Sequence, residues 1–402
     1  MPSTPEIRRE QIKLQVALIT PLIHVKGYSA PETKTAVEQS RLLIEQAEAR
    51  GEAPEDPLLF LSALYGAWAA NFVAFNGTTC RNLATQFLAV ADKQATTSGR
   101  LVAHRMMGHT LVLGGDFAQA RRHYEEAIAL YNPAEHRQLA MRFGQDIMTT
   151  VLSYYSLALW SLGHPEKGLR YAKQAVEVAR ETGHAASLMF AFYMASLFHI
   201  SCRNYSLADE LAHELFMVAD QKGAVLWKAS SLIYQGCVSA ASAKHADAIA
   251  LMTAGIASYR STGATALLTV FLSYLGRAYA DLGQFVEAWR CLDEALSIIE
   301  TAEEKIWEAE VNRISGEITM LSRPMEATKA EQYLTDALAV ARRQHAKSLE
   351  LRAAMSLARL WRDQGKGQQA RELLAPVYGW FTEGFGTRDL REAKVLMDEL
   401  AA

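Results

Sequence analysis

Small and apolar residues recur along the chain at a fixed spacing that predicts pairs of helices. The two clearest copies are the segments 107–131 and 275–299, which superpose without a gap. In both, a glycine within a helical pattern is followed by a glycine-marked turn and then by two alanines seven residues apart. Residues at these spacings fall on one face of a helix. Each copy therefore predicts two helices that cross closely at their small residues.

The same register extends over most of the chain. The small position of the first helix falls, in order, at Gly108, Ser156, Ser196, Gly236, Gly276, Gly316 and Ala358, and four successive intervals are 40 residues long. The small position of the second helix falls at Ala120, Gly168, Ala208, Ala248, Ala288 and Ala370. Bulky neighbours, Tyr124, Leu292 and Leu374 among them, are expected to fill the gap to the next hairpin. Because one hairpin cannot bury both of its faces, we expect the hairpins to stack.

This pattern resembles the tetratricopeptide repeat, with a period of 40 residues in place of the usual 34. The resemblance implies an all-α fold, a right-handed superhelical solenoid of about nine helix hairpins with a C-terminal capping helix. We predict one continuous solenoid with divergent helical hairpins over residues 1–95, the repeat array over 96–384 and the capping helix over 385–402. In the first part, 7–25 should pair with 32–50, and 57–75 with 78–94.

Composition agrees with helices and argues against several classes of partner. Half of the 402 residues are hydrophobic, 21% are charged, and there are only 10 prolines and 24 glycines, which disfavours an all-β fold and disorder. The net charge is −3 and no long basic run occurs, so we expect no nucleic-acid partner. The long uncharged stretches 57–80 and 182–202 contain polar residues, and we expect buried helices there, not membrane spans. The polar first residues predict no signal peptide and a cytoplasmic protein.

No pattern in the sequence predicts catalysis, a cofactor or a metal site. Four cysteines, Cys80, Cys202, Cys237 and Cys291, lie far apart and are expected to be reduced core thiols. His104, His109 and His123 lack the spacing of a zinc site. The pair Glu303-Glu304 lies near a helix end, where solvation or the helix dipole accounts for it. The motifs GxxxxGK[ST], HExxH and GxSxG are missing, so we expect a chain that is not an enzyme.

Four longer strings resemble a more specific group. They span residues 54–77, 135–146, 259–291 and 350–400. Together they are similar to the C-terminal tetratricopeptide-repeat region of bacterial signalling proteins that carry a class III adenylate/guanylate cyclase domain and an AAA-type (STAND-like) ATPase. Gly386 stands where such tails commonly have aspartate. The cyclase and ATPase motifs themselves are not in this sequence, so the chain resembles the repeat portion alone.

The resemblance to tetratricopeptide arrays implies a binding groove along the first helix of each hairpin. Carried onto this register, the groove positions are Tyr154, Trp160, Phe190, Tyr193, Tyr234, Tyr274, Arg277, Arg313, Glu317, Arg352, Arg359 and Arg362. Aromatic and arginine side chains contribute strongly at interfaces, which would suit a peptide with apolar anchors and a carboxylate. The alternative is that the aromatics pack between hairpins and the arginines lie on a solvated face.

These features predict a non-catalytic interaction or sensor module. Its partner would be a protein, a peptide or a small ligand, with a cyclase/ATPase module in cis or in trans and a second copy of the chain also open. A stand-alone scaffold or adaptor is the first alternative, and an enzyme with a site inside the superhelix is the second.

Overall fold

The computed structural model describes residues 4–26, 30–52, 58–322 and 326–401, and over these residues it contains helices and no strand. The first half consists of α1 (Pro5–Lys26), α2 (Pro31–Ala49), α3 (Leu58–Val73), α4 (Gly77–Gln94), α5 (Thr97–Leu113), α6 (Phe117–Leu130), α7 (Pro133–His136), α8 (Leu139–Phe143), α9 (Ile147–Ser161) and α10 (Pro165–Thr182). The second half consists of α11 (Ala185–Ser201), α12 (Tyr205–Gln221), α13 (Val225–Ala241), α14 (His245–Ser261), α15 (Leu268–Asp281), α16 (Phe285–Ala302), α17 (Glu308–Leu321), α18 (Ala327–Arg343), α19 (Lys347–Asp363), α20 (Gly367–Tyr378) and α21 (Arg388–Glu399).

Consecutive helices pair into stacked hairpins, which confirms the all-α solenoid. Within the described residues the pairs run from α1–α2 to α19–α20, and α21 packs on α19 and α20. The two hairpins predicted before the clear repeats are present as α1–α2 and α3–α4. The short helices α7 and α8 interrupt the alternation, because the interval between Gly108 and Ser156 is longer than the others and its additional residues form these two helices.

The small positions lie where the two helices of a hairpin cross. A Cβ added to Gly168 would lie 2.8 Å from the backbone oxygen of Ser156, the small residue of the preceding helix. The corresponding distance from Gly276 to the backbone oxygen of Ala288 would be 3.1 Å. Side chains larger than these would force the helices apart, since packed interiors have no spare volume. The spacing of small residues that defines the repeat therefore reflects the close approach of the two helix backbones in each hairpin.

First and second helices differ in how they are buried. Nearly every residue of α9 and α11 is buried, whereas α10 and α12 bury one stripe and expose the rest. Burial on all sides removes the need for charged residues, which explains the uncharged stretch 182–202. In the described part of the chain, no helix is both long and apolar enough to cross a membrane.

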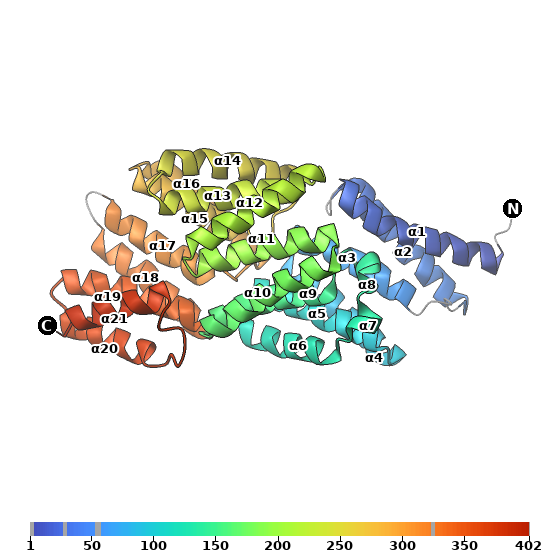
Figure 1. Ribbon diagram of the computed structural model, residues 1–402, viewed down its shortest axis with the longest axis horizontal. Helices are drawn as coiled ribbons and strands as arrows, with labels where there is room; N and C mark the ends of the chain where they lie inside the picture. Colours follow the sequence, from blue (N-terminus) through green and yellow to red (C-terminus); the bar gives the residue numbers. More distant parts are fainter. Residues whose placement is uncertain (1–3, 27–29, 53–57, 323–325, 402) are drawn as a thin grey trace.

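The array coils back on itself, so that helices near the C-terminus lie beside helices of the first half (Figure 1). The carbonyl of Val73, at the end of α3, accepts the N–H groups of Thr265 and Ala266, both at 2.9 Å. The carbonyl of Leu113, at the end of α5, accepts those of Lys305 and Ile306 at 2.8 and 2.9 Å. Carbonyls in the last turn of a helix have no intrahelical partner, and here donors from the next turn of the superhelix supply one.

The same arrangement continues along the array. The hydroxyl of Ser348 in α19 donates to the carbonyl of Trp160 in α9 at 2.5 Å, and the guanidinium of Arg352 donates to the carbonyl of Ser201 in α11. Four successive first helices, α3, α5, α9 and α11, thus end against segments of the second half. As a result, the inner face of the superhelix is closed over much of its length by the chain's own later repeats.

Candidate functional site

A cavity of about 350 Å³ lies on the inner face, between the end of α11 and the helices α15, α17, α19 and α21. We call it the charged cavity, because ten charged side chains line it: Arg203, Arg277, Arg313, Arg352, Arg359, Asp281, Glu310, Glu317, Asp389 and Glu392. Arginines and carboxylates are equal in number, so the lining carries no net charge. Cations and anions alternate through the cavity wall.

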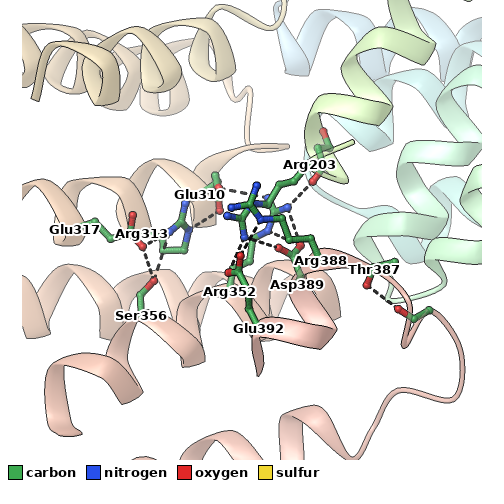
Figure 2. Close-up of polar contacts among 12 residues, drawn as sticks. Arg203, Glu310, Arg313, Glu317, Arg352, Ser356, Thr387, Arg388, Asp389 and Glu392 are labelled. Atoms are coloured by element: carbon green, nitrogen blue, oxygen red, sulfur yellow. Dashed lines mark hydrogen bonds and ion pairs between the residues drawn. The ribbon is translucent and has the colours of Figure 1, made fainter. Parts of the chain in front are cut away.

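Arg352 of α19 is the most deeply buried cation of the charged cavity (Figure 2). Its guanidinium lies 2.7 Å from the carboxylate of Asp389 in α21 and 3.5 Å from that of Glu310 in α17. It also donates to the carbonyl of Ser201 in α11 and lies over the ring of Trp160, 5.1 Å from its centroid. This one side chain therefore connects α19 to four other helices, α9, α11, α17 and α21.

The ion pairs extend from Arg352 in two directions. On one side Arg203, at the end of α11, lies 3.3 Å from Asp389 and 2.8 Å from Glu392, both in α21. On the other side Arg313 lies 2.8 Å from Glu310 and also pairs with Glu317, within the single helix α17 (Figure 2). The network fastens the C-terminal helix to the middle of the array.

The network holds its groups in their charged forms. Burial alone would raise the pKa of Glu310, but Arg313 and Arg352 outweigh burial and lower it to about 2. Burial likewise opposes the charged form of Glu317, and Arg313 and Arg277 outweigh it and lower its pKa. Burial would lower the pKa of Arg352, and Asp389 and Glu310 outweigh it and raise it. None of these three side chains is poised to exchange a proton near neutral pH.

A second, smaller cavity of about 60 Å³ lies on the inner face nearer the N-terminus. We call it the aromatic cavity, because rings dominate its lining: Tyr65, Trp68, Phe72, His109, Tyr154, Phe190, Tyr193, Trp227 and Tyr259. Trp68 and Phe72 are stacked, with ring centroids 4.7 Å apart, and the other rings pack edge to face or tilted, as between Tyr154 and His109, whose centroids are 4.3 Å apart. Arg105 is the one cationic side chain among the residues that line it.

The predicted groove residues divide among four environments. Tyr274, Arg277, Arg313, Glu317, Arg352 and Arg359 line the charged cavity, and Tyr154, Phe190 and Tyr193 line the aromatic cavity. Trp160 and Tyr234 lie in neither cavity and are 2% and 1% exposed. Arg362 is on the surface, where it pairs with Asp363 and Glu399. The structure thus brings six of the predicted residues together in one cavity and leaves three at a separate site.

A family model described as tetratricopeptide repeat matches residues 101–126, 269–294 and 351–376. The chain contains tetratricopeptide repeats. The matched segments cover parts of the hairpins α5–α6, α15–α16 and α19–α20, where the small positions were identified. No curated protein shows a significant match to the sequence.

Three solved structures have a similar tetratricopeptide-like fold. A Rap protein complexed with competence and sporulation factor is 12% identical, with a TM-score of 0.61, and the match covers 97% of this chain and 99% of that one. The apo form of the quorum sensor NprR from B. thuringiensis is 12% identical, with a TM-score of 0.51 and coverage of 92% and 98%. NprR in complex with its cognate peptide NprX is 11% identical, with a TM-score of 0.50 and coverage of 97% and 99%. At this identity, the likeness shows the fold.

Several residues that line the two cavities are not among the predicted groove positions: Glu310, Arg105, Arg203, Asp389 and Glu392. Within α17 a signal was available, because Glu310, Arg313 and Glu317 are spaced three and four residues apart and so meet on one helix face. Arg105 also had a signal, since it precedes the small residue Gly108 by the same three positions by which Arg313 precedes Gly316. Arg203, Asp389 and Glu392 had none, because they enter the site through the coiling of the array.

The cysteines and histidines considered as reactive or metal-binding groups do not gather in a common site. Cys80, Cys237 and Cys291 are buried, Cys202 is half-buried, and none of them forms a disulfide. The rings of His104 and His123 meet through their Nδ1 atoms at 2.9 Å. In the segments that the structure describes, no group of three or more His, Cys, Asp or Glu side chains could hold a metal ion.

Glu304, which lies between α16 and α17 in the chain, is fully buried against the start of α15. Its carboxylate accepts the N–H of Leu267 at 2.7 Å and that of Thr269 at 3.3 Å, and the Thr269 hydroxyl also donates to it. Leu267 has a φ of +65°, which a non-glycine residue adopts only when its surroundings hold it. Burial raises the pKa of Glu304 to about 7, and the hydrogen bonds from Thr269 and Leu267 only partly oppose burial.

We expect Glu304 to make the protein less stable as pH rises. The folded state keeps the proton up to a pKa of about 7, whereas the unfolded chain loses it near 4.5, so the free energy of unfolding should fall between these values. From pH 5.5 to pH 8 the loss is about 2 kcal/mol. Urea titration of the wild type and Glu304→Gln at both pH values measures the difference. Glu303→Gln, at the exposed neighbour, should follow the wild type; equal pH dependence of wild type and Glu304→Gln would contradict the expectation.

Proposed function

We propose that the chain is a non-catalytic, cytoplasmic module that binds a protein or peptide partner in the charged cavity. The observation that carries this proposal is the cavity itself: about 350 Å³ on the inner face, lined by six of the residues that the sequence register placed in a groove. A cavity of this size admits a few side chains of a partner. The remainder of the partner would lie along the exposed edge of the inner face.

The lining suits a peptide more than an apolar small molecule. Arg277 and Arg359 are 37% and 36% exposed at the cavity, so their guanidinium groups can reach a partner. Alternating cations and carboxylates can pair with either charge, and with backbone N–H and C=O groups of an extended segment. Two of the structures with a similar fold are complexes with a factor or a peptide, which supports a partner of this kind here.

The charge states of the network favour binding over catalysis. The pKa of Glu310 is about 2 and that of Glu317 is also lowered, so both remain carboxylates in the physiological range. General acid–base catalysis needs a group that titrates near the working pH. An enzyme with its site inside the superhelix could use this cavity, but neither of these two carboxylates could transfer a proton near the working pH.

The finer proposal is that this module serves a nucleotide-signalling protein. It rests on the similarity of the strings at 54–77, 135–146, 259–291 and 350–400 to the repeat region of cyclase–ATPase proteins. Binding of a partner would then bias an attached or associated ATPase between two states. Reading the coding sequence next to this segment tests it: a cyclase or ATPase in the same frame or a neighbouring gene is expected, and their absence favours the stand-alone adaptor.

Partner capture with charge-reversed variants tests the binding proposal. Arg359→Glu should reduce the amount of each specific partner by at least about tenfold, because an exposed arginine at a contact centre commonly contributes that much. Arg290→Glu reverses a charge on the outer helix α16, where Arg290 is 74% exposed, and should change nothing. The readout is quantitative mass spectrometry of captured proteins and peptides. Partners retained equally by both variants would refute binding in the charged cavity.

A further inference from the structure

Arg105 of α5 is a buried cation that has no acidic partner in the described part of the chain. It is 2% exposed. Its Nη2 donates to the hydroxyl of Tyr65 at 3.0 Å and to Oε1 of Gln145 at 3.3 Å, both neutral groups. Its Nε and Nη1 are buried and have no hydrogen-bond partner, and no carboxylate of the described residues forms an ion pair with it.

Two other arginines of the inner face, one buried and one partly buried, have acidic partners. Arg352 and Arg313 each pair with two carboxylates. A buried charge without a counterion is strongly unfavourable, because the lost hydration is not replaced. The ring of Tyr65, whose centroid lies 5.3 Å from the Arg105 guanidinium carbon, replaces only part of it. The folded chain therefore leaves at Arg105 a positive charge that an anion from outside can neutralise.

His109 supplies a second unpartnered group in the same cavity. It lies one helical turn after Arg105 on α5 and is also 2% exposed, and its Nε2 has no partner among the residues that the structure describes. Its Nδ1 is 3.1 Å from the hydroxyl of Tyr124. Burial, with a smaller contribution from Arg105, holds the pKa of His109 well below its usual range, so the ring is neutral. When Tyr124 donates to Nδ1, the proton lies on Nε2, which is then a donor.

The cavity around these two groups limits what can bind. At about 60 Å³ it holds a head group of a few atoms, since one water needs about 10–15 Å³ by the same measure. Its walls are the rings of Trp68, Phe72 and Tyr154. A single guanidinium matches one negative charge, and apolar walls disfavour a fully hydrated dianion. These properties select a carboxylate over a phosphate.

We propose that the aromatic cavity binds a carboxylate carried on a short apolar stem, with Arg105 neutralising its charge and His109 donating a second hydrogen bond. The carboxylate can belong to a free short-chain acid or to the C-terminus of a peptide with an apolar last residue. The cavity is separate from the charged cavity and shares no lining residue with it. The two proposals therefore stand or fall independently.

Titration of the full chain with propionate tests the site. Thermal shift and tryptophan fluorescence are expected to show saturable binding in the millimolar range, as befits a ligand of about five heavy atoms. Propionamide, which has the same shape without the charge, and inorganic phosphate should show none. The peptide Ala-Ala-Val with a free C-terminus, compared with its C-terminal amide, distinguishes the two sources of the carboxylate. If propionate and the free peptide bind but the amide does not, the site accepts peptide ends as well as free acids. If propionate binds and neither peptide does, the site is assigned to free acids.

Two variants locate the binding. Arg105→Met should weaken propionate binding at least tenfold, and it is expected to fold because it removes an uncompensated buried charge. Arg100→Met, on the same helix, removes a surface arginine that pairs with Asp92 and should bind as the wild type does. Unchanged binding by Arg105→Met, or equal responses to propionate and propionamide, would overturn the proposal. If Arg105→Met does not fold, the wild type decides: no saturable response to propionate or to the free peptide rejects the site.

Discussion

Replacing Arg352 with methionine is expected to lower the free energy of unfolding by about 3–5 kcal/mol, the cost of breaking a buried ion pair from one side. The substitution keeps an unbranched apolar stem and removes the charged guanidinium group. Glu310 would then lose one of the two guanidinium groups that hold its pKa near 2, although it is only 3% exposed. Asp389 and the carbonyl of Ser201 would lose a donor as well.

Urea denaturation measures this effect, and the location of the change provides a second readout. Because Arg352 fastens α21 and α19 to the end of α11, hydrogen exchange in α19–α21 should increase more than in α5–α6. Arg362→Met, on the same helix, is the matched control. Arg362 is 39% exposed and pairs with Asp363 and Glu399, which are both exposed, so its loss should cost less than about 1 kcal/mol. A similar small cost for Arg352→Met would show that the network is not what closes the superhelix.

Replacing Tyr234 with alanine is expected to cost about 3–5 kcal/mol, as for other buried aromatic residues. Tyr234 of α13 is 1% exposed. Its ring lies 5.5 Å from that of Tyr193 and 5.9 Å from that of Phe271, so the substitution leaves a cavity between three first helices. The register of the repeat placed Tyr234 in a binding groove, but its burial gives a partner no access to it.

The matched control is Tyr234→Phe, which keeps the ring and removes the hydroxyl. It should cost less than about 1 kcal/mol, because the hydroxyl of Tyr234 is buried without a hydrogen-bond partner among the described residues. Thermal and urea unfolding of both variants, together with partner capture, test the assignment. If Tyr234→Ala keeps the stability of the wild type and loses its partners, Tyr234 is a contact residue after all.

The stacked hairpins could be predicted from sequence because the cause is local. A small residue in the first helix meets the second helix of the same hairpin twelve positions later, as Gly276 meets Ala288, so the constraint recurs with each repeat. The ion pairs within α17 are local as well, since Glu310, Arg313 and Glu317 lie on one helix face. The helices α7 and α8 were visible only as a longer interval, because a break in a periodic pattern does not specify what fills it.

The candidate site depends on contacts that no local pattern contains. Arg203 and Asp389 are 186 residues apart, and they meet because α21 returns to the end of α11. The curvature that brings them together accumulates over many hairpins, each adding a small rotation. The six predicted residues of the charged cavity lie on the neighbouring helices α15, α17 and α19. Trp160 of α9 is buried by the coiling, against Trp307 at the start of α17, whereas Tyr234 is buried between neighbouring first helices.

Arg105 and Arg313 illustrate the difference between what the sequence determined and what the tertiary structure decided. The sequence by itself determined that both stand three positions before a small residue, and therefore at the same place on the first helix of a hairpin. Only the tertiary structure decided that Arg313 has two carboxylates beside it and that Arg105 faces aromatic rings. The physical reason is that helix periodicity fixes the direction of a side chain along its own helix, whereas the coiling of the array fixes what that side chain meets.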